Sequence, residues 1–137
     1  MADKKKKILL VDDEPDLLEV MEAILHMGGY DVIRASSGKE ALKLAEAEHP
    51  DLILLDIKMP EMDGVQTTDL LRNHESTRDI RIVYLSNVVH DKEVVEGHVM
   101  GSKIGDLYFI PKTYKADKIL EIVKHNLEIA SQNHKSG

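Results

Sequence analysis

The 137-residue sequence contains no cysteine. This absence excludes disulfide bonds, thiolate metal sites and cysteine nucleophiles, and it is compatible with a reducing, cytoplasmic compartment. Long hydrophobic runs are missing as well. No apolar stretch approaches the length of a membrane span, and the four apolar residues after the lysine run Lys4–Lys7 are too few for a signal peptide. We therefore expect neither membrane insertion nor secretion.

Positive charge is scarce, because 18 Lys and Arg residues stand against 25 Asp and Glu, for a formal net charge of -7. This balance argues against direct nucleic-acid binding, for which a basic patch is expected. Glycine is absent from the turn after the first apolar run, where a phosphate-binding loop of the usual kind needs it. That turn reads Asp12-Asp13-Glu14-Pro15 and is acidic instead.

Four short apolar runs each lead to a polar residue. Ile8–Val11 precedes Asp12 and Asp13, Leu52–Leu55 precedes Asp56, Ile82–Leu85 precedes Ser86, and Tyr108–Ile110 leads through Pro111 to Lys112. Runs of this length predict parallel strands that are buried on both faces. In an open α/β sheet, ligands bind beyond the carboxyl ends of the strands. If the runs lie side by side, three carboxylates, a hydroxyl and an ammonium meet in one crevice.

Segments with helical spacing alternate with these runs, and we expect five helices. In chain order they run from Pro15 to the glycines at 28 and 29, from Ser37 to His49, onward from Asp63, from Asp91 to Met100, and from Ala116 to Leu127. Proline is favoured at the first helical position, and glycine just past the last turn. Ser37 with Glu40 predicts a capping box, and Asp63 predicts an N-cap. The more polar segment Asp31–Ala35 predicts a fifth strand, at an edge of the sheet.

Strands that alternate with helices imply βαβ units and a parallel sheet with helices on both faces. The sequence shows no repeat, linker or low-complexity segment. We therefore expect residues 1–137 to form a single domain, with a core of about residues 5–130 and a polar tail at 131–137. We expect this domain either to stand alone or to be excised from a longer protein, and we expect its output to act through a partner.

The acidic crevice predicts a cation site. Three clustered carboxylates repel one another, so such a site needs raised pKa values or a bound cation. Oxygen ligands without cysteine suit a hard ion such as Mg²⁺. Three carboxylates, one lysine and one Mg²⁺ sum to zero charge, which leaves room for an incoming phosphoryl group.

These residues resemble the receiver domain of two-component response regulators. The resemblance covers roughly residues 5–130, and it is carried by the acidic pair Asp12-Asp13, the segment Asp56–Gly64, Ser86 and Lys112. It implies a doubly wound α/β fold, with a five-stranded parallel sheet in the order 2-1-3-4-5 flanked by five helices, the flavodoxin-like arrangement.

The resemblance also implies roles for single residues. Asp56 is the phosphoacceptor, which takes a phosphoryl group from a sensor histidine kinase, a phosphotransfer protein or a small phosphodonor. Asp13 and Asp56 ligate Mg²⁺ together with the backbone carbonyl of Lys58, while Asp12 acts mainly through water. Lys112 pairs with the Asp56 carboxylate and then with a phosphoryl oxygen.

Two residues are implied to form the switch. Ser86 hydrogen-bonds the phosphoryl group and moves inward, and Phe109 corresponds to the switch aromatic of the family. Phe109 has no hydroxyl, so coupling by packing survives while any hydroxyl contact is lost. The family usually has proline directly after the lysine, joined by a cis bond, whereas here Thr113 follows Lys112 and Pro111 precedes it. The loop is therefore expected to be trans, or to have its cis bond before Pro111.

The expected function is a phosphoacceptor that switches its binding surface for an unknown effector protein, as a monomer or weak dimer. It is not expected to be a turnover enzyme. One alternative is a phosphohydrolase with an aspartyl nucleophile, although such enzymes typically carry a second acid where this chain has Lys58. The other alternative is a degenerate receiver that binds partners without being phosphorylated.

Overall fold

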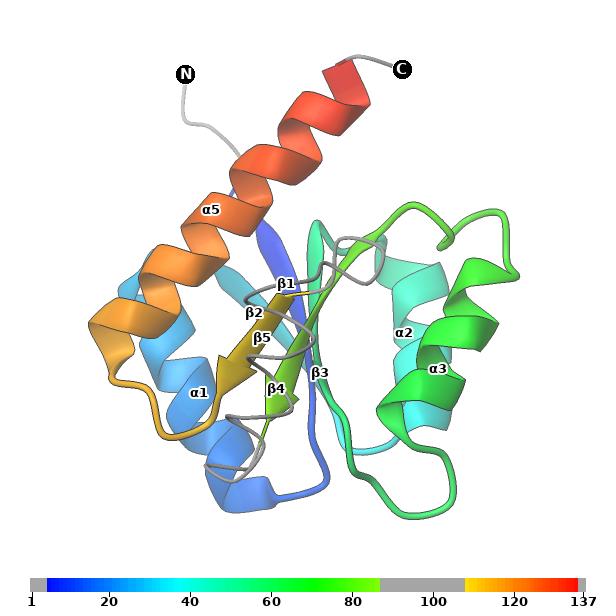
Figure 1. The fold of residues 1–137 in the computed structure, drawn as a ribbon, viewed down its shortest axis with the longest axis horizontal. Coiled ribbons are helices and arrows are strands. Elements are labelled where there is room, and N and C mark those ends of the chain that lie inside the picture. Colours follow the sequence, from blue (N-terminus) through cyan, green and yellow to red (C-terminus); the bar gives the residue numbers. More distant parts are fainter. Residues whose placement is uncertain (1–4, 87–107, 136–137) are drawn as a thin grey trace.

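The computed structural model describes residues 5–86 and 108–135 (Figure 1). Strands and helices alternate along the chain. The elements are β1 (Lys7–Val11), α1 (Pro15–Met27), β2 (Asp31–Ala35), α2 (Gly38–Glu48), β3 (Leu52–Asp56), α3 (Gly64–Arg72), β4 (Arg81–Ser86), β5 (Tyr108–Pro111) and α5 (Ala116–Lys135). The helix predicted over Asp91–Met100 lies outside the described residues.

The five strands form one sheet in the order β2-β1-β3-β4-β5, and every neighbouring pair is parallel. This confirms the predicted fold class and the edge position of β2. Helices α1 and α5 cover one face of the sheet, and α2 and α3 cover the other (Figure 1). Because all strands run the same way, their carboxyl ends meet at one edge of the sheet, the lower edge in Figure 1.

The central strands β1 and β3 are apolar between their ends because both of their faces are covered. Ile8 and Leu10 of β1 pack into the core with α1 and α5, whereas Leu9 and Val11 pack into the core with α2 and α3. Successive side chains of a strand point to opposite faces, so a strand between two helical layers needs an apolar residue at each step. All five residues of β3 are buried, including the terminal Asp56.

The helix ends follow the local signals, with one difference. Pro15 begins α1, and Gly28 is its C-cap. The Ser37 side chain accepts the Glu40 N–H at the start of α2, as expected, but the Glu40 carboxylate accepts from the N–H of Ser36 rather than from that of Ser37. The reciprocal half of the predicted capping box is therefore shifted by one residue.

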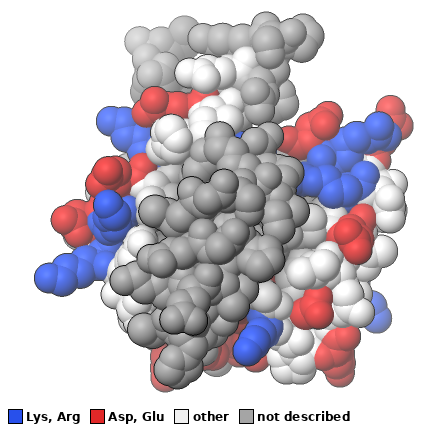
Figure 2. Space-filling view, viewed as in Figure 1, with Lys and Arg blue, Asp and Glu red and all other residues white. Residues whose placement is uncertain are grey.

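Acidic and basic side chains alternate on both flanks of the face seen in Figure 2, over α1 and α5 on one side and α2 and α3 on the other. The described part of this face carries no broad patch of either sign. Among the described residues, no helix combines the length and apolar character that crossing a membrane requires.

Candidate functional site

The polar residues that end the apolar runs gather at the carboxyl edge of the sheet. Asp12 directly follows β1, Asp56 ends β3, Ser86 ends β4 and Lys112 follows β5. The register pairs Asp56 with Leu85 and Ser86 with Pro111, so these strands end at the same level. Sheet pairing, rather than sequence proximity, places these side chains together.

Three carboxylates form the centre of the site. Asp12, Asp13 and Asp56 each offer an oxygen, and these oxygens all lie within 4.8 Å of one another. Asp12 is fully buried and Asp56 is 3% exposed, whereas Asp13 is exposed to solvent. The cluster therefore has two buried carboxylates and one, that of Asp13, which faces solvent.

Lys112 is the cation that faces this cluster. Its Nζ lies 2.7 Å from Asp12 Oδ2, 3.3 Å from Asp56 Oδ2 and 3.6 Å from Glu14 Oε1. Burial disfavours the charged ammonium, but the hydrogen bond and charge of Asp12, together with the charge of Asp56, outweigh it, so the pKa of Lys112 is raised. Lys112 therefore stays charged at neutral pH.

Glu14 was not among the predicted site residues, although it belongs to the acidic run that carries Asp12 and Asp13. Its backbone N–H donates to Asp12 Oδ1 at 2.9 Å, which closes a tight turn after β1. This turn directs the Glu14 carboxylate toward Lys112. The position of Glu14, directly after the acidic pair, was the signal in the sequence that could have identified it.

The surroundings of Asp56 disfavour its charged form. Burial is the largest cause and the neighbouring Asp12 carboxylate the next, and together they raise the pKa of Asp56 to about 6. The Lys112 ammonium and the Lys58 N–H favour the charged form and oppose this rise, but they do not cancel it. A cation at the site would relieve the repulsion between the two buried carboxylates.

The donor set fits a hard divalent cation. All three side chains offer carboxylate oxygen, the class of ligand that Mg²⁺ prefers. Among the described residues, the buried Asp12 Oδ2 has no partner besides the Lys112 ammonium, so it keeps a lone pair for a water ligand. The Lys58 N–H donates to Asp56 Oδ1 at 3.3 Å, which holds the Lys58 backbone beside the cluster.

The loop after Asp56 is held close to β3 by Gly64. Its N–H donates to the carbonyl oxygen of Ile57 at 2.8 Å. A Cβ at position 64 would lie 2.5 Å from the Asp56 carbonyl oxygen, so only glycine allows this approach. Asp63 caps α3 with a complete capping box, in which Asp63 and Gln66 each accept the other's backbone N–H.

The loop around Lys112 is fixed by main-chain contacts. The Lys112 N–H donates to the Ser86 carbonyl oxygen at 2.7 Å, and the Tyr114 N–H donates to the Pro111 carbonyl oxygen at 3.0 Å. No described peptide bond is cis, so the bonds before Pro111 and Thr113 are both trans. Ser86 is buried beside this loop.

Phe109 lies apart from the carboxylates, on the α2 and α3 face of the sheet. Its ring packs against that of Tyr84, with a centroid separation of 5.4 Å and an interplanar angle of 34°. Tyr84, Phe109 and Ile57 help to line a hollow of about 320 Å³ beside α3. The sequence indicated only that Tyr84 belongs to an apolar strand, because its partners Phe109 and Thr68 lie on other elements.

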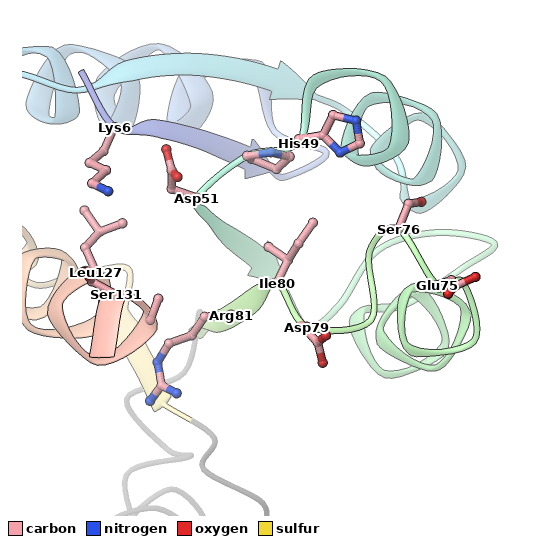
Figure 3. Close-up of a pocket in the computed structure, with 12 residues that line it drawn as sticks. Lys6, His49, Asp51, Glu75, Ser76, Asp79, Ile80, Arg81, Leu127 and Ser131 are labelled. Carbon is pink, nitrogen blue, oxygen red and sulfur yellow. The ribbon is translucent and has the colours of Figure 1, made fainter. Parts of the chain in front are cut away.

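Another hollow, of about 300 Å³, lies at the opposite edge of the sheet (Figure 3). Lys6, Asp51 and Arg81 line it at the amino ends of β1, β3 and β4, and Leu127 of α5 also lines it. Two of its polar side chains are engaged within the protein: Arg81 Nε donates to Asn126 Oδ1, and Asp51 Oδ2 accepts the Lys7 N–H. None of the predicted site residues lines it.

Comparison with known proteins agrees with this geometry. Residues 8–124 match the family described as "Response regulator receiver domain". The alkaline phosphatase synthesis transcriptional regulatory protein PhoP of Bacillus subtilis (strain 168) is 37% identical over 119 residues, which cover 87% of this chain and 47% of PhoP. The chain thus spans about half the length of that curated relative.

Solved structures show the same fold. A putative response regulator from Chloroflexus aurantiacus J-10-fl is 28% identical with a TM-score of 0.77, over 91% of this chain and 99% of that protein. The receiver domain of the sensor histidine kinase PA1611 from Pseudomonas aeruginosa PAO1, which has magnesium coordinated in its active-site cleft, is 26% identical with a TM-score of 0.76, over 91% and 99%.

The family match covers most of the chain, and the strand order and the acidic cluster at the carboxyl edge agree with it. Receiver domains are signalling domains of two-component systems that interact with histidine kinases and effectors, rather than classical turnover enzymes, and they bind Mg²⁺ in an acidic pocket. This chain belongs to the response regulator receiver domain family.

Proposed function

We propose that the protein is a phosphoacceptor that takes a phosphoryl group on Asp56 in a Mg²⁺-dependent reaction. The observation that carries the proposal is the buried Asp56 carboxylate, which lies 3.3 Å from the Lys112 ammonium and within 4.8 Å of two further carboxylates. A nucleophile, a fixed cation and an oxygen-rich cation site are the parts that phosphoryl transfer requires.

In the reaction, a carboxylate oxygen of Asp56 forms a bond to phosphorus. The bond from phosphorus to the imidazole nitrogen of a phosphohistidine breaks, and its electron pair stays on that nitrogen, which is then free to take a proton. The product on the protein is an acyl phosphate. The donor is a sensor histidine kinase or a phosphotransfer protein, and a small phosphodonor can replace it.

Asp13, Asp56 and the backbone carbonyl of Lys58 would hold Mg²⁺, with Asp12 acting through a water ligand. The chemistry that this ion supplies when bound is neutralisation of charge on the phosphoryl oxygens. Asp13 suits the ligand role because it is the exposed member of the cluster and is within reach of an ion that arrives from solvent. Buried Asp12 anchors Lys112 through the 2.7 Å ion pair.

Lys112 and Ser86 complete the contacts to the phosphoryl group. Lys112 exchanges part of its pairing with Asp56 for a phosphoryl oxygen, and the Ser86 hydroxyl donates to another. The Lys112 N–H donates to the Ser86 carbonyl oxygen, which joins the end of β4 to the residue after β5. Inward movement of Ser86 allows Phe109 to repack, which changes the surface offered to a downstream effector protein in the cytoplasm.

Intact mass spectrometry after incubation with acetyl phosphate and Mg²⁺ tests the proposal. We expect one phosphoryl adduct on the wild type and none on Asp56→Asn, because the amide is not a nucleophile. Asp51→Asn is the matched control, since Asp51 precedes the opposite end of the same strand, and it should form the adduct. Chelation of Mg²⁺ should prevent adduct formation on the wild type.

Other outcomes would identify the alternatives. An adduct on both the wild type and Asp56→Asn would mean that Asp56 is not the nucleophile. A folded wild type that forms no adduct would be a degenerate receiver that binds partners without phosphorylation. Sustained release of phosphate from a phosphate ester would indicate a phosphohydrolase.

A further inference from the structure

Tyr84 makes a polar contact that is unusual for a core position of β4. Its side chain is 5% exposed, yet its hydroxyl lies 2.5 Å from Thr68 Oγ1 on α3. Tyr84 lies two residues before Ser86 on the same strand. Buried hydroxyl groups normally have a hydrogen-bond partner. The role of this one depends on which hydroxyl donates the proton and on which group the hydrogen bonds lead to.

The direction of the bond follows from the proton count. Thr68 Oγ1 donates its single proton to the Gly64 carbonyl oxygen, at 2.8 Å. Since a threonine hydroxyl has one proton, it must accept from Tyr84. The contact is thus a directed chain, from the Tyr84 hydroxyl through the Thr68 hydroxyl to the Gly64 carbonyl.

The chain ends beside the proposed phosphoacceptor. The Gly64 N–H donates to the Ile57 carbonyl oxygen, and Gly64 packs so closely on the Asp56 carbonyl that no Cβ fits. Gly64 therefore closes the loop of residues 57–63, which carries Lys58. Any shift of the Tyr84 hydroxyl acts on the end of α3 that holds this loop.

The other side of Tyr84 contacts the switch aromatic. The Tyr84 and Phe109 rings pack with centroids 5.4 Å apart, and the two residues are paired across β4 and β5. Phe109 has no hydroxyl of its own. Tyr84 thus contacts both the Phe109 ring and, through the Thr68 hydroxyl and the Gly64 carbonyl, the end of the loop after Asp56.

We propose that Tyr84 is a positioning residue that couples the packing of Phe109 to the loop after Asp56, which carries Lys58, through its hydrogen bond to Thr68. This inference rests on the proposed function of Asp56 as phosphoacceptor. Burial raises the pKa of Tyr84, so its phenol stays protonated and remains a donor at neutral pH. A change in the packing of Phe109 is therefore transmitted to the loop of residues 57–63, and a change in that loop is transmitted to Phe109.

The test uses the fact that Phe109 is the single phenylalanine of the sequence. Isotope-labelled phenylalanine then gives one set of ring signals in an NMR spectrum of the wild type and of the Thr68 variants, which report on Phe109 alone. Tyr84→Phe and Tyr30→Phe each add a second set of ring signals, which is assigned to the new phenylalanine by a further spectrum of the same variant with Phe109→Leu. These signals are recorded with Mg²⁺, before and after acetyl phosphate, for the wild type, Tyr84→Phe, Thr68→Val and Thr68→Ser. Mass spectrometry of the same samples measures the rate of adduct formation.

We expect Tyr84→Phe and Thr68→Val to reduce the phosphorylation-dependent shift of the Phe109 signals at least twofold and to slow adduct formation severalfold. Thr68→Ser keeps the hydroxyl and should restore both values. Tyr30→Phe is the matched control, because it removes a phenol hydroxyl beside the opposite core, and it should behave as the wild type.

The outcomes separate this inference from the function on which it rests. A wild type without an adduct overturns both. An adduct and a Phe109 shift that are equal in the wild type and a folded Tyr84→Phe overturn the role of Tyr84 and leave the phosphoacceptor proposal intact. Loss of the shift in Thr68→Ser as well as in Thr68→Val would show that packing, and not the hydroxyl, is responsible.

Discussion

At the scale of single residues, the site is a balance between burial and charge. Asp12 and Asp56 are both buried, and one lysine pairs with both of them. Burial, followed by repulsion from Asp12, outweighs the effect of one ammonium, which is why the pKa of Asp56 is raised although Lys112 is adjacent. The same imbalance favours a divalent cation and makes the free protein sensitive to pH.

The raised pKa of Asp56 predicts a stability change with pH in the absence of metal. Between about pH 4 and pH 6 the folded state holds a proton on Asp56 that the unfolded state has lost, so the free energy of unfolding falls as pH rises. We expect Asp56→Asn to remove this fall. The change that the substitution causes in the free energy of unfolding should therefore be about 2–3 kcal/mol more favourable to the folded state at pH 7.5 than at pH 4. Urea unfolding in a chelator measures it, and an equal effect at both pH values would contradict it.

At the scale of elements, the ends of the helices hold the loops that carry the site. Helix α3 begins with a complete capping box, and its first residue, Gly64, packs on the backbone of Asp56. Asp63 was predicted as an N-cap because an aspartate after Met-Pro-Glu-Met and before an apolar helical pattern is a local signal. Gln66 completes the box at the spacing that capping boxes require.

Loss of this cap should destabilise the protein and loosen the loop after Asp56. We expect Asp63→Ala to lower the free energy of unfolding by about 1 kcal/mol, because the Gln66 N–H loses its acceptor. Asp63→Asn keeps a capping oxygen and should cost much less. Denaturant titration of both variants measures the difference, and equal losses would mean that the charge of Asp63, rather than its capping bond, matters.

At the scale of the whole molecule, one sheet edge joins residues from four strands into a single site. The parallel register brings the ends of β1, β3, β4 and β5 to one level, and the crossover helices keep both faces of the sheet covered. The hollow at the opposite edge is lined by both acidic and basic side chains, and Arg81 and Asp51 there form hydrogen bonds within the protein. The carboxyl edge instead carries a cluster of three carboxylates.

Mg²⁺ should therefore stabilise the folded molecule, since the site exists only when the strands are paired. At a concentration one hundred times the dissociation constant, binding adds about 2.7 kcal/mol to the free energy of unfolding. We expect thermal unfolding at pH 7.5 to shift upward with Mg²⁺ in the wild type and in Asp79→Asn, which lies at the other edge. Asp13→Asn should lose most of this shift; an undiminished shift in Asp13→Asn would place the ion elsewhere.

The sequence by itself determined what is local. Apolar runs predicted the strands, Pro15, Gly28 and Asp63 marked helix ends, and the acidic pair with the Asp56–Gly64 segment identified the family, because each depends on neighbours within a few residues. Only the tertiary structure decided that Glu14 reaches Lys112 and that Tyr84 contacts both Thr68 and Phe109. Those contacts depend on the spacing of strands and helices and on side-chain directions, which packing sets and local sequence does not.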